Sequence, residues 1–291
     1  MREFRDKVAV VTGAASGIGR ALAERFAVEG MKIILADIEE GALTRTASEM
    51  KEKGATVFEV LIDVSKAKEV ETLAQKTLEV FGAVHILCNN AGVSGDFGAS
   101  WEQTIENWEW VLGVNLWSVI HGIRTFVPIM LDQHTEGHVV NTASMAGLLS
   151  LPFTSVYHAT KHAVVTLSES LYYELALQGT PVKVSVLCPG FVKTNIMESD
   201  RNRPMRLRTH DRLQPEREQT WLDAYREFIA TGLPPAEVAE QVFNAIRDEK
   251  FYVFSHPQDL ALVRARMEAI FEQRNPTLDF VPDAMKQRLH L

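Results

Sequence analysis

Short apolar runs rich in β-branched residues recur along the chain and alternate with longer segments whose apolar residues lie three or four positions apart. The runs predict buried parallel strands, and the longer segments predict amphipathic helices. The predicted strands are 7–12, 31–36, 56–61, 84–88, 139–143, 182–187 and 251–254. This alternation is typical of a doubly wound α/β fold, so we predict three layers, with a parallel sheet of about seven strands between helices on both faces.

No repeat, low-complexity tract or flexible linker divides the chain, so residues 1–291 are predicted to form one domain. One long helix is expected over about 104–131. The regular pattern is lost at about 195–235, and this segment is predicted to be a substrate lid. A C-terminal extension follows at about 256–291, in which 260–271 is amphipathic and expected to pack on this domain or on a neighbouring subunit.

The predicted lid is rich in arginine, which leaves two interpretations open. The arginines are Arg201, Arg203, Arg206, Arg208, Arg212 and Arg217. We expect a solvated loop, because charge runs usually face water. The alternative is that they grip an anionic substrate, such as an acyl thioester or a carboxylate.

Charge and cysteine content narrow the classes of partner. With 30 basic and 38 acidic residues, a formal net charge of -8 argues against a nucleic-acid surface. Cys88 and Cys188 both end apolar runs and are expected to be buried thiols in a reducing compartment. We see no signal peptide and no run that looks long enough to span a bilayer, so we expect a cytoplasmic protein without a membrane partner.

A glycine-rich turn follows the first predicted strand and opens a helix. It carries Gly13, Ser16, Gly17, Ile18 and Gly19. Between a strand and a helix, such a turn lets the backbone approach a pyrophosphate and predicts dinucleotide binding.

The second predicted strand ends at an acidic residue. Asp37 lies eighteen residues after Gly19. A carboxylate there accepts hydrogen bonds from the adenosine ribose and repels a 2′-phosphate, which favours NAD over NADP. The alternative is that Asp37 simply caps the next helix.

Three side chains near the fifth predicted strand suggest proton chemistry. Ser144 follows that strand, and Tyr157 and Lys161 lie four residues apart on a predicted helix, hence on one face. A lysine ammonium near a phenol favours the phenolate, so we expect Tyr157 to have a lowered pKa and to act as an acid and base. His158 and His162 share the same spacing, but no glutamate lies between them and the charge of Lys161 opposes a cation, so we predict no metal site.

Together, Thr12-Gly13-x-x-x-Gly17-Ile18-Gly19, Asp63, Asn89-Asn90-Ala91-Gly92, Asn115, Ser144, Tyr157-x-x-x-Lys161 and Pro189-Gly190 resemble the short-chain dehydrogenase/reductase family over about 7–254. The resemblance implies a Rossmann fold and hydride transfer between NAD and a secondary alcohol or ketone. It also implies that Tyr157 transfers the proton, Lys161 assists it and binds the nicotinamide ribose, Ser144 orients the substrate oxygen and Asn115 holds a relay water.

The resemblance further implies where the cofactor binds. The glycine-rich turn would surround the pyrophosphate, Asp63 and Val64 the adenine, and Asn90 and Ala91 the riboses, with Thr194 beside the carboxamide. Gly92, Pro189, Gly190 and Val192 complete the expected cofactor site. Members of the family commonly form homodimers or homotetramers, so we expect one of these.

A weaker similarity, in 110–130 with the lid and tail, links the chain to members that oxidise bulky secondary alcohols, including benzylic alcohols. The expected substrate pocket is Phe97, Met145, Leu149, Phe153, Phe191 and Trp221. Such side chains line apolar pockets but also form ordinary core. A different class of function stays open, in which the protein is a catalytically silent NAD-binding sensor or scaffold.

Overall fold

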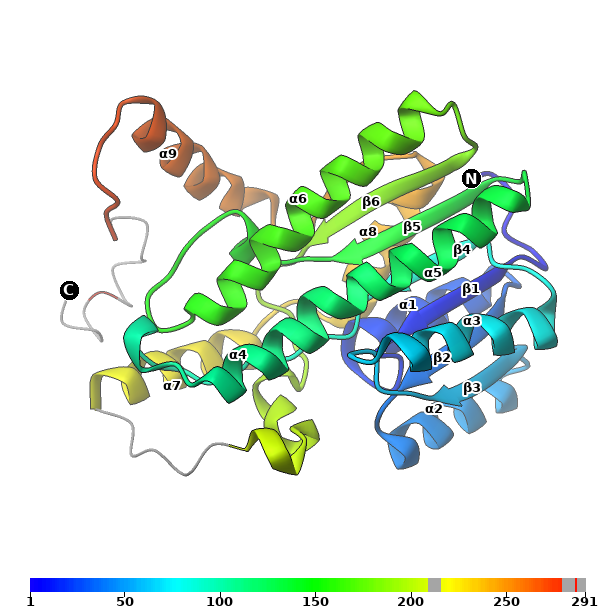
Figure 1. Ribbon diagram of the computed structural model, residues 1–291, viewed down its shortest axis with the longest axis horizontal. Helices are drawn as coiled ribbons and strands as arrows, with labels where there is room; N and C mark the ends of the chain where they lie inside the picture. Colours follow the sequence, from blue (N-terminus) through cyan, green and yellow to red (C-terminus); the bar gives the residue numbers. More distant parts are fainter. Residues whose placement is uncertain (209–215, 279–285, 287–291) are drawn as a thin grey trace.

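A seven-stranded parallel sheet forms the centre of the protein in the computed structural model, which describes residues 1–208, 216–278 and 286 (Figure 1). The strands are β1 Val8–Thr12, β2 Lys32–Asp37, β3 Val57–Leu61, β4 Ile86–Asn89, β5 Gly137–Thr142, β6 Val182–Cys188 and β7 Tyr252–Phe254. Their spatial order is β3-β2-β1-β4-β5-β6-β7, and every neighbouring pair is parallel. The predicted fold class and all seven strands are confirmed.

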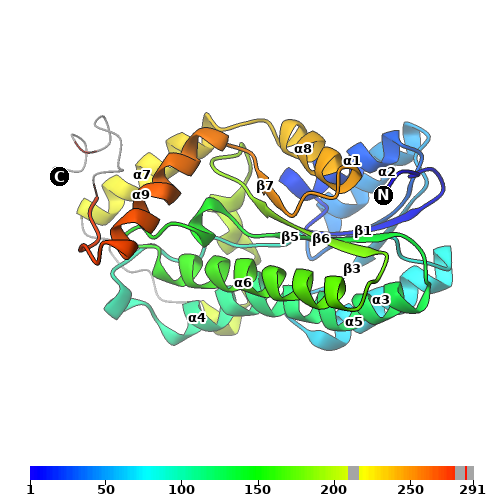
Figure 2. The same cartoon turned by 90° about the horizontal axis from the view of Figure 1, so that it is seen from above.

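Helices cover both faces of this sheet, as Figure 2 shows. One face carries α1 Gly17–Val28, α2 Glu40–Glu52 and α8 Pro235–Arg247, and the other carries α3 Ala67–Phe81, α4 Ile105–Leu112, α5 Ser118–Asp132 and α6 Ser155–Leu177. Each face has its own apolar core, in which Phe26 of α1 and Phe126 of α5 are fully buried. Because burial of one such side chain contributes roughly 2 kcal/mol, the sheet is fixed firmly enough to position loops at its edge.

The predicted helix at about 104–131 is in fact interrupted. Between α4 and α5, residues Gly113–Trp117 form a π-helical turn, which inserts an extra residue and changes the direction of the side chains. The three pieces together span Ile105–Asp132 and are long and apolar enough to cross a membrane by length and composition alone, so the expectation that no run is long enough was wrong. In this fold the segment packs against the sheet, where Phe126 and Met130 lie in the core.

The predicted lid contains more regular structure than we expected. Short 3₁₀ turns at Ile196–Asn202 and Met205–Leu207 are followed by a fifteen-residue helix, α7 Glu216–Ala230. Of the described arginines in this segment, Arg203 is buried, contrary to the expectation, whereas Arg201, Arg206 and Arg208 are exposed as expected, and Arg201 and Arg206 also form ion pairs. Arg212 and the side chain of Arg217 lie outside the described residues. In the C-terminal extension, the amphipathic segment forms α9 Leu260–Phe271 on the same chain, and 279–285 and 287–291 lie outside the description.

Candidate active site

One large cavity, of about 600 Å³, lies beyond the carboxyl ends of β1, β2, β4, β5 and β6. The connections that leave these strands line its floor, and the lid with parts of α7 and α9 lines the opposite side. Open α/β sheets bind ligands at this edge, because backbone groups and loop side chains converge there.

The glycine-rich turn is built so that no side chain could replace two of its glycines. Gly13 has a φ of +66°, and a Cβ on Gly19 would lie 2.1 Å from the carbonyl oxygen of Gly13. The turn therefore brings bare backbone to the start of α1, where unpaired N–H groups favour an anion. These features fit the pyrophosphate of a dinucleotide.

Thr12 joins the glycine-rich turn to the Asn-Asn-Ala-Gly turn after β4. Its hydroxyl oxygen accepts hydrogen bonds from the backbone N–H groups of Asn90 at 2.9 Å and Ala91 at 3.1 Å. The Asn90 amide donates to the Thr12 carbonyl at 3.0 Å and accepts from Thr142 at 3.2 Å. Three strand ends are thereby held together beneath the cavity.

Asp37 lies at the end of β2 and lines the cavity. Its two oxygens accept hydrogen bonds from the backbone N–H groups of Ala15, at 2.9 Å, and Glu39, at 3.0 Å. Burial raises the pKa of the Asp37 carboxyl, and these two bonds oppose that rise. Asp37 therefore braces the turn before α2, whose N-cap residue is Glu39, and also faces the cavity, so its contact with the adenosine ribose stays a prediction.

Asp63 likewise has a structural role. Its carboxylate accepts from the backbone N–H and the hydroxyl of Ser65, at 3.0 and 2.6 Å, and forms an ion pair with Lys66 at 3.4 Å. These contacts organise the start of α3. Asp63 and Val64 still line the cavity, so a contact with adenine stays a prediction.

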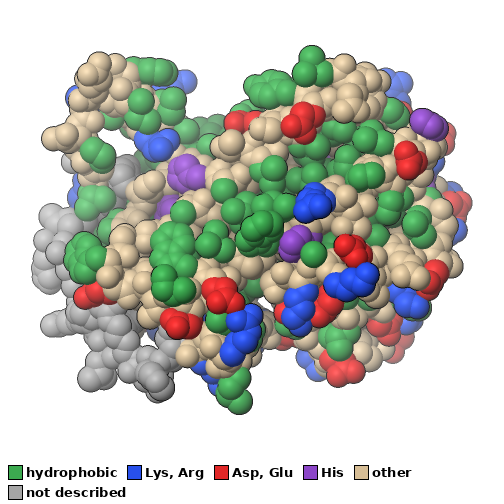
Figure 3. All heavy atoms as spheres, in the orientation of Figure 1, with side chains coloured by type: hydrophobic (Ala, Val, Ile, Leu, Met, Phe, Trp, Pro, Cys, Tyr) green, Lys and Arg blue, Asp and Glu red, His purple; other side chains and the backbone are tan. Residues whose placement is uncertain are grey.

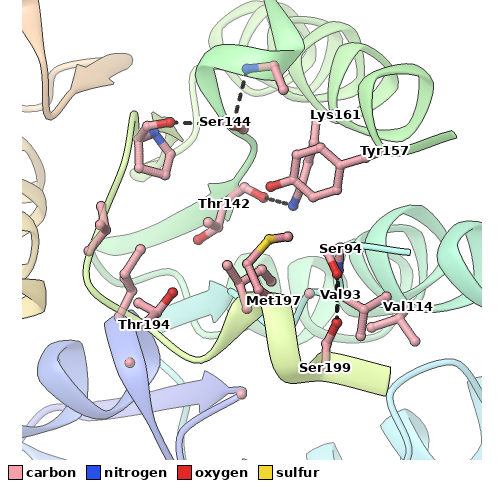
Figure 4. A pocket seen from close by; sticks show the side chains of 18 of the residues that line it. Val93, Ser94, Val114, Thr142, Ser144, Tyr157, Lys161, Thr194, Met197 and Ser199 are labelled. Atoms are coloured by element: carbon pink, nitrogen blue, oxygen red, sulfur yellow. Dashed lines mark hydrogen bonds between the residues drawn. The ribbon is translucent and has the colours of Figure 1, made fainter. Parts of the chain in front are cut away.

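Ser144, Tyr157 and Lys161 converge on the cavity from β5 and α6, as Figure 4 shows. The Ser144 hydroxyl follows β5, accepts from the backbone N–H of Ala146 at 3.1 Å and donates to the Pro189 carbonyl at 3.4 Å. The Lys161 Nζ donates to the Thr142 carbonyl at 2.9 Å and lies 5.6 Å from the centroid of the Tyr157 ring. The predicted proton-transfer groups are therefore neighbours.

Burial dominates the electrostatics of these groups. It raises the pKa of the Tyr157 phenol, and the hydrogen bond with Ser144 opposes the rise. It also lowers the pKa of the Lys161 amine to about 8. The expectation of a lowered Tyr157 pKa is therefore wrong for this structure, because desolvation outweighs the groups that favour the phenolate.

Asn115 occupies the π-helical turn and is fully buried. Its side chain accepts from the Val93 N–H at 2.8 Å and donates to the Val93 carbonyl at 2.9 Å, so it holds the chain just after the Asn-Asn-Ala-Gly turn. A Cβ on Gly92 would lie 3.5 Å from the Asn115 Oδ1 and 3.6 Å from the Lys161 Nζ. Asn115 and Lys161 thus both approach Gly92, and the role of Asn115 in a water relay stays a prediction.

Most of the residues predicted for the site line the cavity. They are Gly13, Ser16, Gly17, Ile18, Asp37, Asp63, Val64, Asn90, Ala91, Gly92, Phe97, Ser144, Met145, Leu149, Tyr157, Lys161, Pro189, Gly190, Phe191, Val192, Thr194 and Trp221. Gly19, Asn115 and Phe153 do not line it. Gly19 packs beneath the glycine-rich turn. Phe153 lies against Trp221, with ring centroids 6.0 Å apart.

Sequence reasoning missed an aromatic wall formed by α7. Tyr225 and Phe228 line the cavity beside Trp221, and Phe191 stacks on Phe228 with ring centroids 5.1 Å apart. Phe97 meets the Tyr225 ring edge-on at 5.2 Å. A signal was present, because Trp221, Tyr225 and Phe228 follow a spacing of four and three that is typical of one helix face.

A family model described as short chain dehydrogenase matches residues 7–204. The chain belongs to this family. It is 34% identical over 287 residues to a CLA biosynthesis dehydrogenase/reductase of Lactiplantibacillus plantarum, covering 98% of this chain and 100% of that protein. It is 31% identical over 290 residues to a C alpha-dehydrogenase of Sphingobium, covering 99% and 93%.

Solved structures agree with this assignment. A short-chain dehydrogenase/reductase from Burkholderia phymatum in complex with NAD superimposes with a TM-score of 0.93 at 48% identity, covering 95% of this chain and 98% of that one. An alcohol dehydrogenase from Thermococcus sibiricus complexed with 5-hydroxy-NADP gives a TM-score of 0.69 at 28% identity, covering 85% and 95%. The protein is therefore an oxidoreductase of the short-chain dehydrogenase family, and both NAD and NADP occur among its relatives.

Proposed function

We propose that this short-chain dehydrogenase uses NAD to interconvert a bulky apolar or aryl secondary alcohol and the corresponding ketone. The observation that carries the proposal is the single cavity that extends from Asp37, past Tyr157, to the aromatic wall of α7. One chamber of this kind accommodates a dinucleotide and an apolar substrate together. The relative solved with NAD supports the choice of cofactor.

The cofactor, when bound, supplies the hydride acceptor or donor at its nicotinamide carbon. The glycine-rich turn and the start of α1 would hold its pyrophosphate, and Asp37 would accept from its adenosine ribose and repel a 2′-phosphate. Pro189, Gly190, Val192 and Thr194 line the part of the cavity where the nicotinamide end would lie. Lys161 would donate to the nearby ribose.

The proton of the substrate hydroxyl is managed by Tyr157 and its neighbours. During oxidation, the Tyr157 phenolate takes that proton, and during reduction the phenol returns it to the ketone oxygen. Ser144 orients the same oxygen by donating a hydrogen bond. The ammonium of Lys161, 5.6 Å from the phenol ring, favours the phenolate within an otherwise apolar surrounding.

The aromatic and aliphatic lining supports a bulky apolar substrate. Phe97, Met145, Leu149, Phe191 and Trp221 line the cavity, and Tyr225 and Phe228 extend the lining. An anionic substrate is less well supported, because Arg201, Arg203 and Arg206 already face carboxylates of Glu39, Asp96 and Glu109.

We further propose that the chain forms a homodimer or homotetramer. Hydrophobic side chains gather over α5 and α6 on the face seen in Figure 3. Exposed large hydrophobic residues are Tyr172, Tyr173 and Leu177 of α6 and Trp117, which ends the π-helical turn before α5. A second copy of the chain would bury them, and light scattering after size exclusion measures the mass directly.

We also propose that the enzyme works in the cytoplasm. Cys88 and Cys188 are both buried and free, and burial raises the pKa of each thiol. Protonated, buried thiols are compatible with a reducing compartment and require no disulfide. Fractionation of source cells followed by immunoblotting tests this location.

The proposed reaction is tested by NADH formation from a panel of aryl and alkyl secondary alcohols, with NADP in parallel. In Tyr157→Phe, turnover should fall by at least about a hundredfold, because the proton-transferring hydroxyl is lost while the ring remains. NAD affinity, measured by fluorescence titration, should stay within about threefold of wild type. A silent panel together with normal NAD binding would instead favour the sensor or scaffold.

A further inference from the structure

The lid and the loop after β2 meet at Glu39, at the end of the cavity where Asp37 lies. Arg201 forms an ion pair with the Glu39 carboxylate, and the Asn202 Nδ2 donates to the same carboxylate oxygen at 2.8 Å. Asp37, Glu39, Arg201 and Asn202 all line the cavity. The lid therefore reaches beyond the substrate to the place where the adenosine ribose of a dinucleotide would lie.

Two acidic residues, Asp37 and Glu39, line this end of the cavity. The backbone N–H of Glu39 donates to the Asp37 Oδ1 at 3.0 Å, which brings the second acid next to the first. After burial and the backbone bonds, the charge of Glu39 is a further influence that raises the pKa of Asp37. A phosphate on the ribose would therefore meet repulsion from both acids.

Arg201 is the one arginine among the described residues that line the cavity. Its Nη2 donates to Glu39, and its Nη1 donates to the carbonyl groups of Glu198 at 2.7 Å and Asn195 at 3.3 Å. Arginine is the side chain best suited to bind a phosphate through paired N–H groups. Here its charge and its donors are already engaged by the protein itself.

The charge of Glu39 is maintained by this contact. Burial alone would raise the pKa of the Glu39 carboxyl, but the hydrogen bonds from Arg201 and Asn202 outweigh that effect and lower it. Arg45 contributes a smaller effect of the same sign. Glu39 is therefore ionised near neutral pH and neutralises Arg201.

We propose that Glu39, by pairing with Arg201, is a second residue besides Asp37 that makes this cavity select NAD over NADP. The inference rests on the proposed use of NAD. While the pair is intact, a 2′-phosphate finds two carboxylates and an arginine that is already occupied. Without the Glu39 carboxylate, the Arg201 guanidinium becomes available at the same end of the cavity and binds the phosphate.

The test is the ratio of kcat/KM for NADP to kcat/KM for NAD, measured at saturating alcohol. Glu39→Gln keeps the shape of the side chain and removes its charge, so this ratio should rise by about tenfold, the effect of one charge-assisted bond. Adding Arg201→Met to Glu39→Gln should cancel most of the gain, because the gain depends on the released guanidinium. NAD titration by intrinsic fluorescence shows that each variant is folded.

Two control variants distinguish the loss of the Glu39 charge from a loosening of the lid as the cause of a higher ratio. Asn202→Ala removes one contact with Glu39 without changing any charge, so the ratio should stay at the wild-type value. Arg206→Met removes a lid arginine whose partner, Glu109, does not line the cavity, and the ratio should again be unchanged. A rise in either control would overturn the inference, because lid loosening would then explain the gain.

Other results would contradict either this inference or the proposed cofactor. If Glu39→Gln leaves the ratio unchanged, or if the double variant keeps the full gain, the inference is wrong and the proposed function stands. If wild-type protein itself uses NADP as well as NAD, the proposed cofactor is wrong and the inference falls with it. Wild-type data test the proposed cofactor and the variants test the inference, so the two failures are distinguishable.

Discussion

The amine of Lys161 is buried beside the proton-transferring phenol, and this position has a cost in stability. Burial lowers the pKa of Lys161 from 10.5 to about 8. Below about pH 8 the folded protein must hold a desolvated ammonium, whereas the unfolded chain holds a hydrated one. Between about pH 8 and 10.5 the folded protein releases this proton first, so the penalty disappears as pH rises.

We therefore predict a pH-dependent effect of Lys161→Met. The difference in free energy of unfolding between the variant and wild type should favour the variant most at neutral pH. This difference should shrink by up to about 3 kcal/mol as the pH approaches 10.5. Turnover should be lost at every pH. Urea titrations at neutral and alkaline pH measure the difference. Lys68→Met, on an exposed position of α3, is the matched control and should show no such trend.

For single residues, the sequence predicted which side chains form the site better than it predicted how buried those side chains are. Ser144, Tyr157 and Lys161 could be found because strand and helix spacing alone place them together. The direction of the Tyr157 pKa shift could not be predicted, since the burial that raises this pKa exists only in the folded chain. Arg203 was expected to be solvated for the same reason, because its partner Asp96 is distant in sequence.

At the scale of elements, the lid is fastened to the rest of the protein by Arg203. Its buried guanidinium donates to both carboxylate oxygens of Asp96, at 2.6 and 3.1 Å, and lies 4.2 Å from the ring centroid of Trp110. A hydroxyl contact between Ser199 and Ser94, at 3.1 Å, forms a second attachment. Together these contacts hold the 3₁₀ turns of the lid against the loop after β4 and against α4.

Arg203→Met should loosen this lid. Because a hydrogen bond to a charged group contributes about 2 kcal/mol, we expect a lower melting temperature and faster cleavage within the lid during limited proteolysis. KM for the alcohol should rise by about tenfold with a smaller change in kcat, because the lid shapes the pocket but donates no proton. In Arg206→Met, which loses an exposed pair, all three measurements should stay near wild type. Unchanged proteolysis and KM in Arg203→Met would contradict the attachment.

Elements differed in how far they could be predicted. The strands were predictable because a buried β-branched run needs no tertiary context to be read. The π-helical turn of Gly113–Trp117 was not, since the hydrogen bonds between its Asn115 and Val93 form only after folding. Helix α7 was hidden by neighbouring arginines and prolines, although its aromatic spacing was visible.

The whole molecule should be sensitive to acid, because two histidines are buried where β4 and β5 begin. Burial lowers the pKa of His138 to about 3, and burial together with the charge of Lys7 lowers that of His85 to about 4. The His85 Nδ1 accepts from the Val8 N–H at 3.1 Å, which requires a neutral ring. As the pH falls below 6.5, these two histidines become protonated in the unfolded chain but stay neutral in the folded protein. The free energy of unfolding therefore decreases.

We predict that the free energy of unfolding falls between pH 6.5 and about 4, with each histidine contributing on the order of 1–3 kcal/mol. Gln in place of His85 keeps an acceptor for Val8 and does not titrate, so His85→Gln should flatten part of this slope. Chemical denaturation across the acid range measures it. His134→Gln, at an exposed position after α5, should leave the slope unchanged; equal slopes in all three proteins would contradict the prediction.

The family model ends at residue 204, whereas α7 and α9, which close the cavity, lie beyond it. The glycine-rich turn and the proton-transfer groups Tyr157 and Lys161 therefore lie in the part of the chain that matches the family model, whereas the aromatic side chains of α7 lie outside it. An exchange of α7 alone between relatives would therefore alter this wall and leave α8 and β7, which belong to the core of the sheet, in place.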